Sequence, residues 1–98
     1  MTDFLPEHPG RILMTEFLEP LGISQYALAK AIGVPLPRIN AVVLGKRSIT
    51  ADTGLRLSKA LGLSDMFWIN MQARYDADLA RVAHRDELQA IPELTTAC

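Results

Sequence analysis

The side chains best able to make specific polar contacts gather in one segment, residues 33 to 50, with the sequence GVPLPRINAVVLGKRSIT. Between residues 20 and 51 the chain has no Asp or Glu, but it has four cations, Lys30, Arg38, Lys46 and Arg47. The four cations give this block a formal charge of +4. Because the formal net charge of the chain is −1, the remaining residues carry −5. Asn40 adds an amide that can hydrogen-bond two atoms of one base. The segment is therefore suited to local contacts with a polyanion.

The residue types needed for catalysis or metal binding are present but are not arranged for either. His8 and His84 lie at opposite ends of the chain and belong to no Glu-x-x-His or His-x-x-x-His pattern, so we expect both to be structural. The sequence has no glycine-rich phosphate loop, and no Ser, His and Asp set stands in a recognisable nucleophile context. It therefore predicts no enzyme, no metal site, no cofactor and no small-molecule substrate.

Length and composition predict a single folded domain over residues 1–98. Of the 98 residues, 49% are hydrophobic and 21% are charged, which is typical of folded soluble proteins. No apolar run approaches the length of about 18 residues that a membrane span requires, and the acidic N-terminus is unlike a signal peptide. We therefore expect a cytoplasmic protein without membrane contact. The only cysteine is Cys98, which leaves no internal disulfide and no cysteine-based zinc site.

Helical periodicity and helix-end signals predict an all-α fold with five helices. The first should begin at Pro9 and stop before Pro20, because a proline disfavours helical geometry in the residue before it. The other four are expected over residues 24–33, 35–45, 50–62 and 64–83, with Ser24 and Thr50 as N-caps. Glycines follow three of these helices, at the position where helices commonly end.

Residues 24–45 have the pattern of a DNA-binding helix-turn-helix, in which two short helices are joined by a tight turn. Ala29 is small where the helices would cross, Gly33 leaves the turn unhindered, and Ile39 would enter the core. An ordinary helical hairpin could show the same spacing. The combination with helix caps and local positive charge favours DNA binding.

The second helix of this motif is predicted to lie in the major groove. A helical wheel places Ile39, Val42 and Val43 inward and leaves Pro37, Asn40, Ala41 and Leu44 outward, with Arg38 on the flank. Asn40 can pair with adenine, Arg38 can reach guanine or a phosphate, and Leu36 or Ala41 can contact a thymine methyl. Gln25, Lys46 and Arg47 suit phosphates, although the last two could instead form a solvated loop that balances the helix dipole. The predicted DNA-binding residues are Gln25, Leu36, Pro37, Arg38, Asn40, Ala41, Lys46 and Arg47.

Two apolar stripes follow the helix over residues 64–83, whereas a surface helix needs only one. The first stripe comprises Trp68, Met71, Tyr75, Leu79 and Val82. The second comprises Met66, Ile69, Ala73, Ala77 and Ala80. The second stripe either widens the buried face of the monomer or forms a symmetric dimer interface, for which N-terminal contacts through Phe4 and Leu5 are the alternative.

A short C-terminal extension is expected over residues 85–98. Its apolar side chains, Leu88, Ile91 and Leu94, can pack back on the domain, while the last four residues are expected to fray.

A family resemblance rests on five motifs in a fixed order: HPGRIL, FLEPLGISQ, LAKAIGVP, RINAVVLGKRSITADTGLRLSKALG and FWINMQARYD. Over residues 7–94 the chain resembles the HigA-type antitoxins, also known as virulence-associated protein I, within the Xre/Cro-repressor-like helix-turn-helix proteins. The resemblance implies a five-helix lambda-repressor-like DNA-binding domain. It further implies a bacterial homodimer that binds double-stranded operator DNA and represses its own operon. The implied protein partner is a HigB-type toxin, an mRNA-cleaving ribonuclease that the antitoxin neutralises.

Two other functions remain compatible with the sequence. The chain could be a stand-alone helix-turn-helix repressor without a toxin, or a protein-interaction module that has lost DNA binding. A neighbouring gene for a small basic protein would separate the antitoxin from the stand-alone repressor. Binding to the gene's own upstream DNA would exclude the interaction module.

Overall fold

The structure, a computed structural model, describes residues 6–95 as helices joined by short turns. The first helix is continuous and consists of three segments, α1 (Pro9–Ile12), η1 (Leu13–Leu18) and α2 (Glu19–Leu21). The others are α3 (Gln25–Ile32), α4 (Leu36–Val43), α5 (Ala51–Leu61), α6 (Phe67–Ala83) and α7 (Arg85–Ala90). All regular structure within residues 6–95 is helical, which confirms the all-α prediction.

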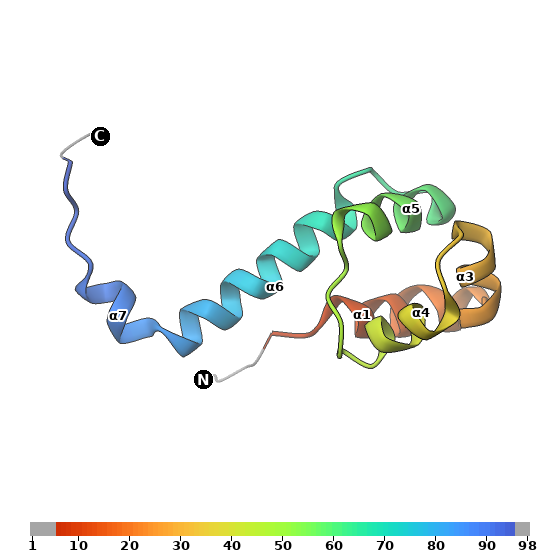
Figure 1. The fold of residues 1–98 in the computed structure, drawn as a ribbon, viewed down its shortest axis with the longest axis horizontal. Coiled ribbons are helices and arrows are strands. Elements are labelled where there is room, and N and C mark those ends of the chain that lie inside the picture. Colours follow the sequence, from red (N-terminus) through yellow and green to blue (C-terminus); the bar gives the residue numbers. More distant parts are fainter. Residues whose placement is uncertain (1–5, 96–98) are drawn as a thin grey trace.

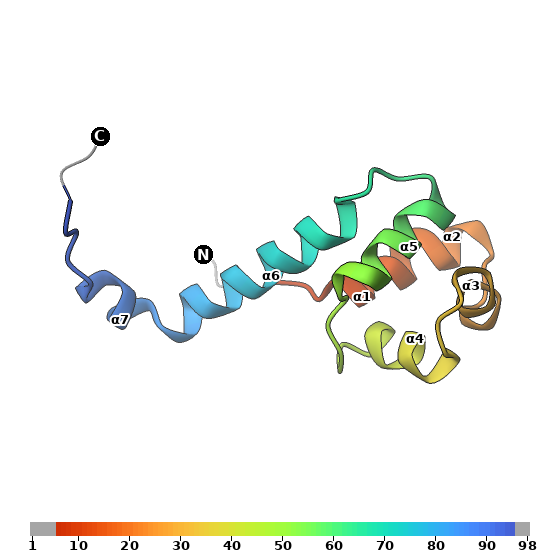
Figure 2. The same ribbon diagram turned by 45° about the horizontal axis from the view of Figure 1, so that its top comes forward.

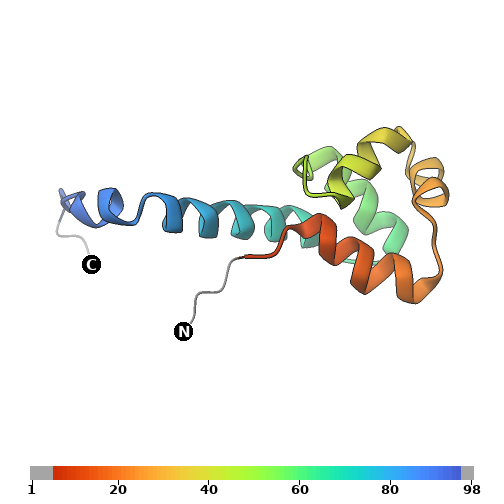
Figure 3. The same ribbon diagram turned by 90° about the horizontal axis from the view of Figure 1, so that it is seen from below.

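The helices divide into a globular part and a projecting arm (Figure 1). The first helix, α3, α4 and α5 surround a common centre, and α6 begins against them before it runs outward (Figure 2). Seen from below, the far half of α6 and all of α7 stand clear of the other helices (Figure 3). The arm explains the large radius of gyration, 16.5 Å, since a compact chain of this length would have about 13 Å.

The core lies where the first helix, α4, α5 and the root of α6 meet. Its fully buried side chains include Leu13, Ile39, Leu57 and Trp68, each with no exposed surface. Trp68 is held by edge-to-face contacts, with its ring centre 5.3 Å from that of Phe17 and 5.0 Å from that of Phe67. The apolar side chains between α3 and α4 are buried as well, namely Leu28, Ile32, Val34 and Val42. One apolar centre therefore fixes the relative positions of α3 and α4.

The first helix does not stop before Pro20, so that prediction was wrong. Its middle segment, η1, is a π-helix, and the Glu19 amide donates to the carbonyl of Met14 five residues earlier. A proline ring inside an α-helix clashes with the carbonyl four residues before it. The wider π-turn ahead of Pro20 relieves that clash. The helix therefore continues to Leu21 and ends at Gly22, whose φ is 67°.

The C-terminal segment also departs from expectation, because it does not pack back on the domain. α6 runs without interruption to Ala83, and the helix α7 follows it after His84. Leu88, Ile91 and Leu94 are all exposed, since α6 has carried them beyond reach of the core. α6 itself begins at Phe67, because residues 65 and 66 form a turn. Most of the segment expected to fray, and the alternative contacts through Phe4 and Leu5, lie outside the described residues.

Candidate nucleic-acid interface

The turn between α3 and α4 is built by local hydrogen bonds. The Ser24 hydroxyl accepts the Ala27 amide at 3.0 Å and caps the start of α3. At its other end the carbonyl of Ala29 accepts the amides of Gly33 and Val34 at 3.0 and 3.1 Å. Gly33 has a φ of 72°, a left-handed conformation that favours glycine. The turn therefore depends on the glycine that the sequence places there.

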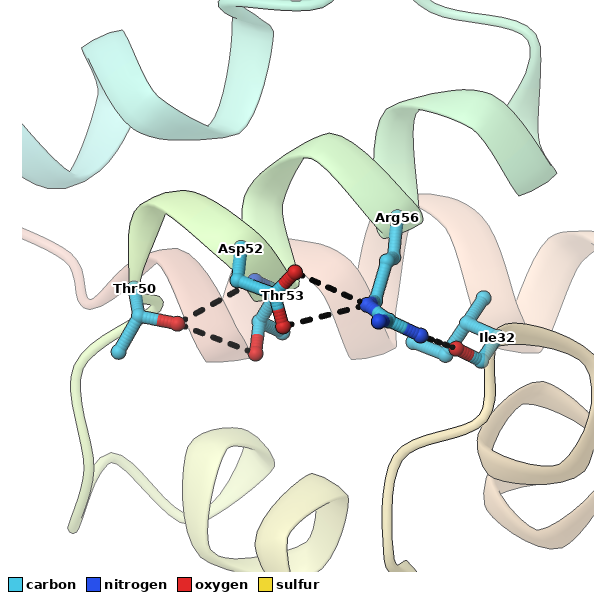
Figure 4. A network of polar contacts seen from close by, with 5 residues as sticks. All are labelled: Ile32, Thr50, Asp52, Thr53 and Arg56. Atoms are coloured by element: carbon cyan, nitrogen blue, oxygen red, sulfur yellow. Dashed lines mark hydrogen bonds and ion pairs between the residues drawn. The ribbon is translucent and has the colours of Figure 1, made fainter.

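A long-range contact from α5 braces this turn (Figure 4). The Arg56 guanidinium donates through Nη1 to the carbonyl of Ile32 at 2.7 Å, at the C-terminal end of α3. Its Nε donates to the Asp52 carboxylate at 3.1 and 3.2 Å. Carbonyls in the last turn of a helix lack intrahelical partners, and a cation there also complements the helix dipole. The i,i+4 spacing of Asp52 and Arg56 is visible in the sequence, but the contact with Ile32 is not.

The helical wheel for α4 agrees with the burial of its side chains. Ile39 and Val42 are buried in the core, whereas Pro37, Asn40 and Leu44 are exposed. The other predicted base-contacting residues, Leu36, Arg38 and Ala41, are half-buried along the edges of the same face. The exposed face of α4 and its edges thus bring together the five residues of this helix that were predicted to contact DNA, and Asn40 is the exposed polar side chain among them.

The loop after α4 holds its two cations in a defined position. Gly45 has a φ of 77°. The Gly45 amide donates to the Val42 carbonyl at 3.0 Å, and the Lys46 amide donates to the Ala41 carbonyl at 2.9 Å. These two bonds form a Schellman motif, which satisfies the last carbonyls of a helix. Lys46 and Arg47 are both exposed. Since they directly follow the end of α4, their positive charges lie beside the C-terminal end of that helix.

The far end of this loop is anchored to α6 by Gln72, a residue to which the sequence patterns assign no role. The Gln72 side chain is buried; its Oε1 accepts the Ile49 amide at 2.9 Å, and its Nε2 donates to Asp76 at 2.9 Å. A buried amide left without such partners would be costly, so the pairing is stabilising. The available signal was a polar residue at helical spacing between Trp68 and Tyr75.

Gln25 is the predicted contact whose position fits least well. It is the first residue of α3, but its side chain is half-buried, and its Nε2 donates to the sulfur of Met14 at 3.8 Å. Its Oε1 is buried and has no hydrogen-bond partner among residues 6–95. The side chain therefore faces the first helix.

The proposed dimer stripe on α6 is partly used within the monomer. Ile69 is half-buried and packs on Gly54 of α5, where a Cβ atom would lie 3.1 Å from its Cγ1. Met66, Ala73 and Ala80 are exposed, and Ala77 is half-buried. The first stripe is fully buried only at Trp68, where α6 begins. Farther along the arm, its members Leu79 and Val82 are exposed.

Among residues 6–95 no helix is both long and apolar enough to cross a membrane. Within the same range no three His, Cys, Asp or Glu side chains gather closely enough to hold a metal ion.

The exposed helix α4 follows a glycine turn, precedes a cationic loop and packs on an all-helical core. This arrangement defines a helix-turn-helix protein. Consistent with this class, the helix-turn-helix family model matches residues 14–68. The chain is 51% identical to virulence-associated protein I of Dichelobacter nodosus over 74% of this chain and 68% of that protein. It is 35% identical to the antitoxin HigA-1 of Vibrio cholerae over 91% of this chain and 84% of that protein.

The fold is likewise similar to a solved structure, the Pseudomonas aeruginosa antitoxin HigA with the higBA promoter. That comparison has a TM-score of 0.85 and 38% identity, and it covers 92% of this chain and 99% of the other. The chain belongs to the helix-turn-helix family and, within it, to the HigA antitoxins and virulence-associated proteins.

Proposed function

We propose that this protein is an antitoxin that binds its own operator as a dimer, represses its operon and neutralises a ribonuclease toxin. The observation that carries the proposal is the exposed face of α4, with Asn40 at its centre and Lys46 and Arg47 beside its end. Family membership and the promoter complex of the similar HigA support the same function. The protein would act as a DNA-binding regulator in the bacterial cytoplasm and not as an enzyme.

The proposed contacts with DNA are of two kinds, contacts with base edges and contacts with backbone phosphates. Asn40 would pair with adenine, and Arg38 would reach guanine or a phosphate from the edge of the face. Pro37, Leu36 and Ala41 offer apolar surface to thymine methyls. Lys46 and Arg47 would contact phosphates, which position the protein without reading sequence.

Gln25 has a more limited role in this arrangement. Its side chain faces Met14, so the phosphate contact that we propose at the start of α3 comes from free backbone amides there.

A dimer would supply the second helix-turn-helix motif that tight DNA binding requires. Two-fold dimers commonly read half-sites about one helical turn apart, because one helix-turn-helix buries little DNA surface. We propose that the dimer forms along α6, through the accessible members of the second stripe, Met66, Ala73, Ala77 and Ala80. Ile69 would support this surface from within, since it already packs on α5. The exposed Leu79 and Val82 extend the apolar surface along the arm.

The proposal is tested by one measurement of DNA binding and one of protein binding. A gel shift should show binding to DNA from upstream of the protein's own gene, and much weaker binding to a scrambled duplex at the same salt. Co-expression with the neighbouring open reading frame, followed by purification on one tag, should recover both proteins. DNA binding without co-purification would leave a stand-alone repressor. Co-purification without DNA binding would leave a protein-interaction module.

A further inference from the structure

A groove of about 690 Å³ runs between residues 6–12 and the root of α6. The half-buried side chains that form its apolar floor are Ile12, Phe67, Met71 and Tyr75. His8 fixes one wall, because its ring meets the Tyr75 ring edge-on with the centres 5.0 Å apart. The Nδ1 atom of His8 also accepts the Gly10 amide at 2.9 Å and so caps the first helix. The groove is therefore a defined apolar surface, and among residues 6–95 it is open to solvent.

The rim of the groove has one cation that no described neighbour balances. On one side, Glu7 is paired with Arg11 at 3.0 Å. On the other side, Asp78 is paired with Arg81 at 2.7 Å. Arg74, one helical turn before Asp78, is exposed and belongs to no ion pair within residues 6–95. A segment that fills the groove should therefore combine apolar side chains with an acidic group.

The end of the arm has the composition that the groove requires. Leu88 is 47% exposed and Ile91 is 65% exposed. Asp86, in the first turn of α7, is exposed and belongs to no ion pair within the described part of the chain. A single chain cannot join these two surfaces, because the 17 residues of α6 form a rod about 25 Å long. α7 therefore stands clear of its own groove (Figure 3).

Two-fold symmetry removes this obstacle, because in an antiparallel pair of α6 helices the tip of each arm lies beside the root of the other. Arg74 and Asp86 are each six positions from Ala80, so an axis at Ala80 sets Arg74 of one copy opposite Asp86 of its partner. The same register sets Ala77 opposite Ala83, which leaves only short side chains where the helices approach most closely. Opposite charges and apolar surfaces then meet at both ends of the pair.

The junction between α6 and α7 suits this arrangement. His84 has a φ of −122° and a ψ of 30°, so the chain turns there and α7 leaves the axis of α6. α7 can thus lie over the partner's groove instead of continuing along the partner's α6. The register places Leu88 of one copy near residues 71 to 75 of the other, and these residues line the groove.

We propose that the groove is the docking site for α7 of a second copy, so that two chains exchange arms in an antiparallel dimer. This inference rests on the dimer of the proposed function and adds its direction, its register and the occupant of the groove. The floor of each groove covers Leu88 and Ile91 of the partner. Arg74 pairs with Asp86 twice, once on each side of the axis.

Disulfide cross-linking tests the register. In a Cys98→Ser background, Arg74→Cys and Asp86→Cys are made as separate proteins, and both sites are exposed and outside the core. After the two proteins are refolded together, mild oxidation should give a covalent dimer, because a disulfide joins Cα atoms no more than about 7 Å apart. Each protein alone should give little, since the register separates its two cysteines by about 18 Å along the helices. Ala60→Cys, at an exposed site on α5, refolded with Asp86→Cys is the matched control.

Charge reversal tests the ion pair without cross-linking. Arg74→Glu and Asp86→Arg should each weaken dimerisation by about tenfold, because each places two pairs of like charges across the interface. The variant with both changes should recover an affinity within about threefold of wild type. Lys59→Glu, at an exposed site on α5, should leave association unchanged. Sedimentation equilibrium measures the dissociation constants, and circular dichroism confirms that each variant is folded.

The outcomes separate this inference from the proposed function. Cross-linking of the mixture together with recovery in the double variant would support the exchanged arms. A wild-type dimer without either result would overturn the inference and leave an operator-binding dimer of another geometry. Efficient cross-linking of Arg74→Cys with itself would also overturn it, because the axis would then lie near residue 74. A wild-type protein that stays monomeric and does not bind operator would overturn the proposed function as well.

Discussion

The globular part of the molecule and its C-terminal arm are made from similar proportions of apolar residues but use them differently. In the globular part, side chains such as Leu13, Ile39 and Trp68 are completely covered by neighbouring helices. On the arm, Val82 is 61% exposed and Ile91 is 65% exposed. Exposed apolar surface on a projecting helix commonly marks a contact with another chain. The globular part therefore has a core that is covered within one chain, whereas residues 79–95 of the arm are all exposed.

Trp68 joins the two parts, and its removal should have the largest effect on stability. Trp68→Ala would leave a cavity at the root of α6 and should lower the free energy of unfolding by about 3–5 kcal/mol. The matched substitution on the arm, Val82→Ala, should change monomer stability by no more than about 0.5 kcal/mol. Urea unfolding followed by circular dichroism at several protein concentrations separates monomer stability from association. Equal losses in the two variants would contradict the division into a covered core and an open arm.

A charge at the centre of the second stripe should weaken association without unfolding the domain. Ala73 is exposed in the monomer, so Ala73→Glu should fold. In a two-fold dimer the carboxylate would appear twice without a partner, and dimerisation should weaken by about 3–5 kcal/mol. Analytical ultracentrifugation of this variant and of Ala60→Glu, an exposed control on α5, provides the test. A folded Ala73→Glu protein that still sediments as a dimer would place the interface elsewhere.

Substitutions on the exposed face of α4 should affect DNA and leave the fold intact. Arg38→Ala and Asn40→Ala should each weaken operator binding by about 1–3 kcal/mol and relax the preference for particular bases. The unfolding free energy should change little for Asn40→Ala, because its side chain is outside the core. Affinity for operator and mutated operator at matched salt is the measurement. An affinity equal to that of wild type would remove the residue from base reading.

Neutralising the cationic loop should act on all sequences alike. Lys46 and Arg47 are proposed to contact phosphates, and each lost phosphate contact should reduce the slope of affinity against salt by about one. The variant with both residues changed to Ala should therefore lose affinity for operator and for random DNA to a similar degree. An unchanged slope would mean that the pair is only solvated. Lys30→Ala, a cation in the last turn of α3, provides a comparison outside the loop.

Acidification should have the smallest effect on the free energy of unfolding, and this effect should arise in the globular part. Burial lowers the pKa of the His8 imidazole below its ordinary value of 6.5, so the unfolded chain binds more protons than the folded one just below that pH. The stability from neutral His8 is present above about pH 6.5 and is lost as pH falls through the folded-state pKa. Unfolding free energies at pH values on both sides of this range should decrease more for wild type than for His8→Asn. Parallel curves would assign the pH dependence to other groups.

Most of the secondary structure and the exposed face of α4 could be predicted because their causes are local. Ser24 and Thr50 cap helices through amides three residues away. Gly33 ends α3 by a conformation that few other residues adopt readily. The periodic positions of Ile39 and Val42 then decide which side of α4 is exposed. Each of these signals acts within one or two helical turns, so the sequence alone contains them.

Tertiary structure decided the features that depend on distant partners. A Cβ atom on Gly10 would lie only 1.7 Å from the Val42 carbonyl, an approach of helices that no local pattern announces. Gln72 reaches Ile49 across 23 positions, and Arg56 reaches Ile32 across 24. The exposure of Leu88, Ile91 and Leu94 follows from the direction of α6, which is set by the packing of Trp68. Apolar periodicity marks a surface that must be covered, but only the packed helices decide whether the same chain covers it.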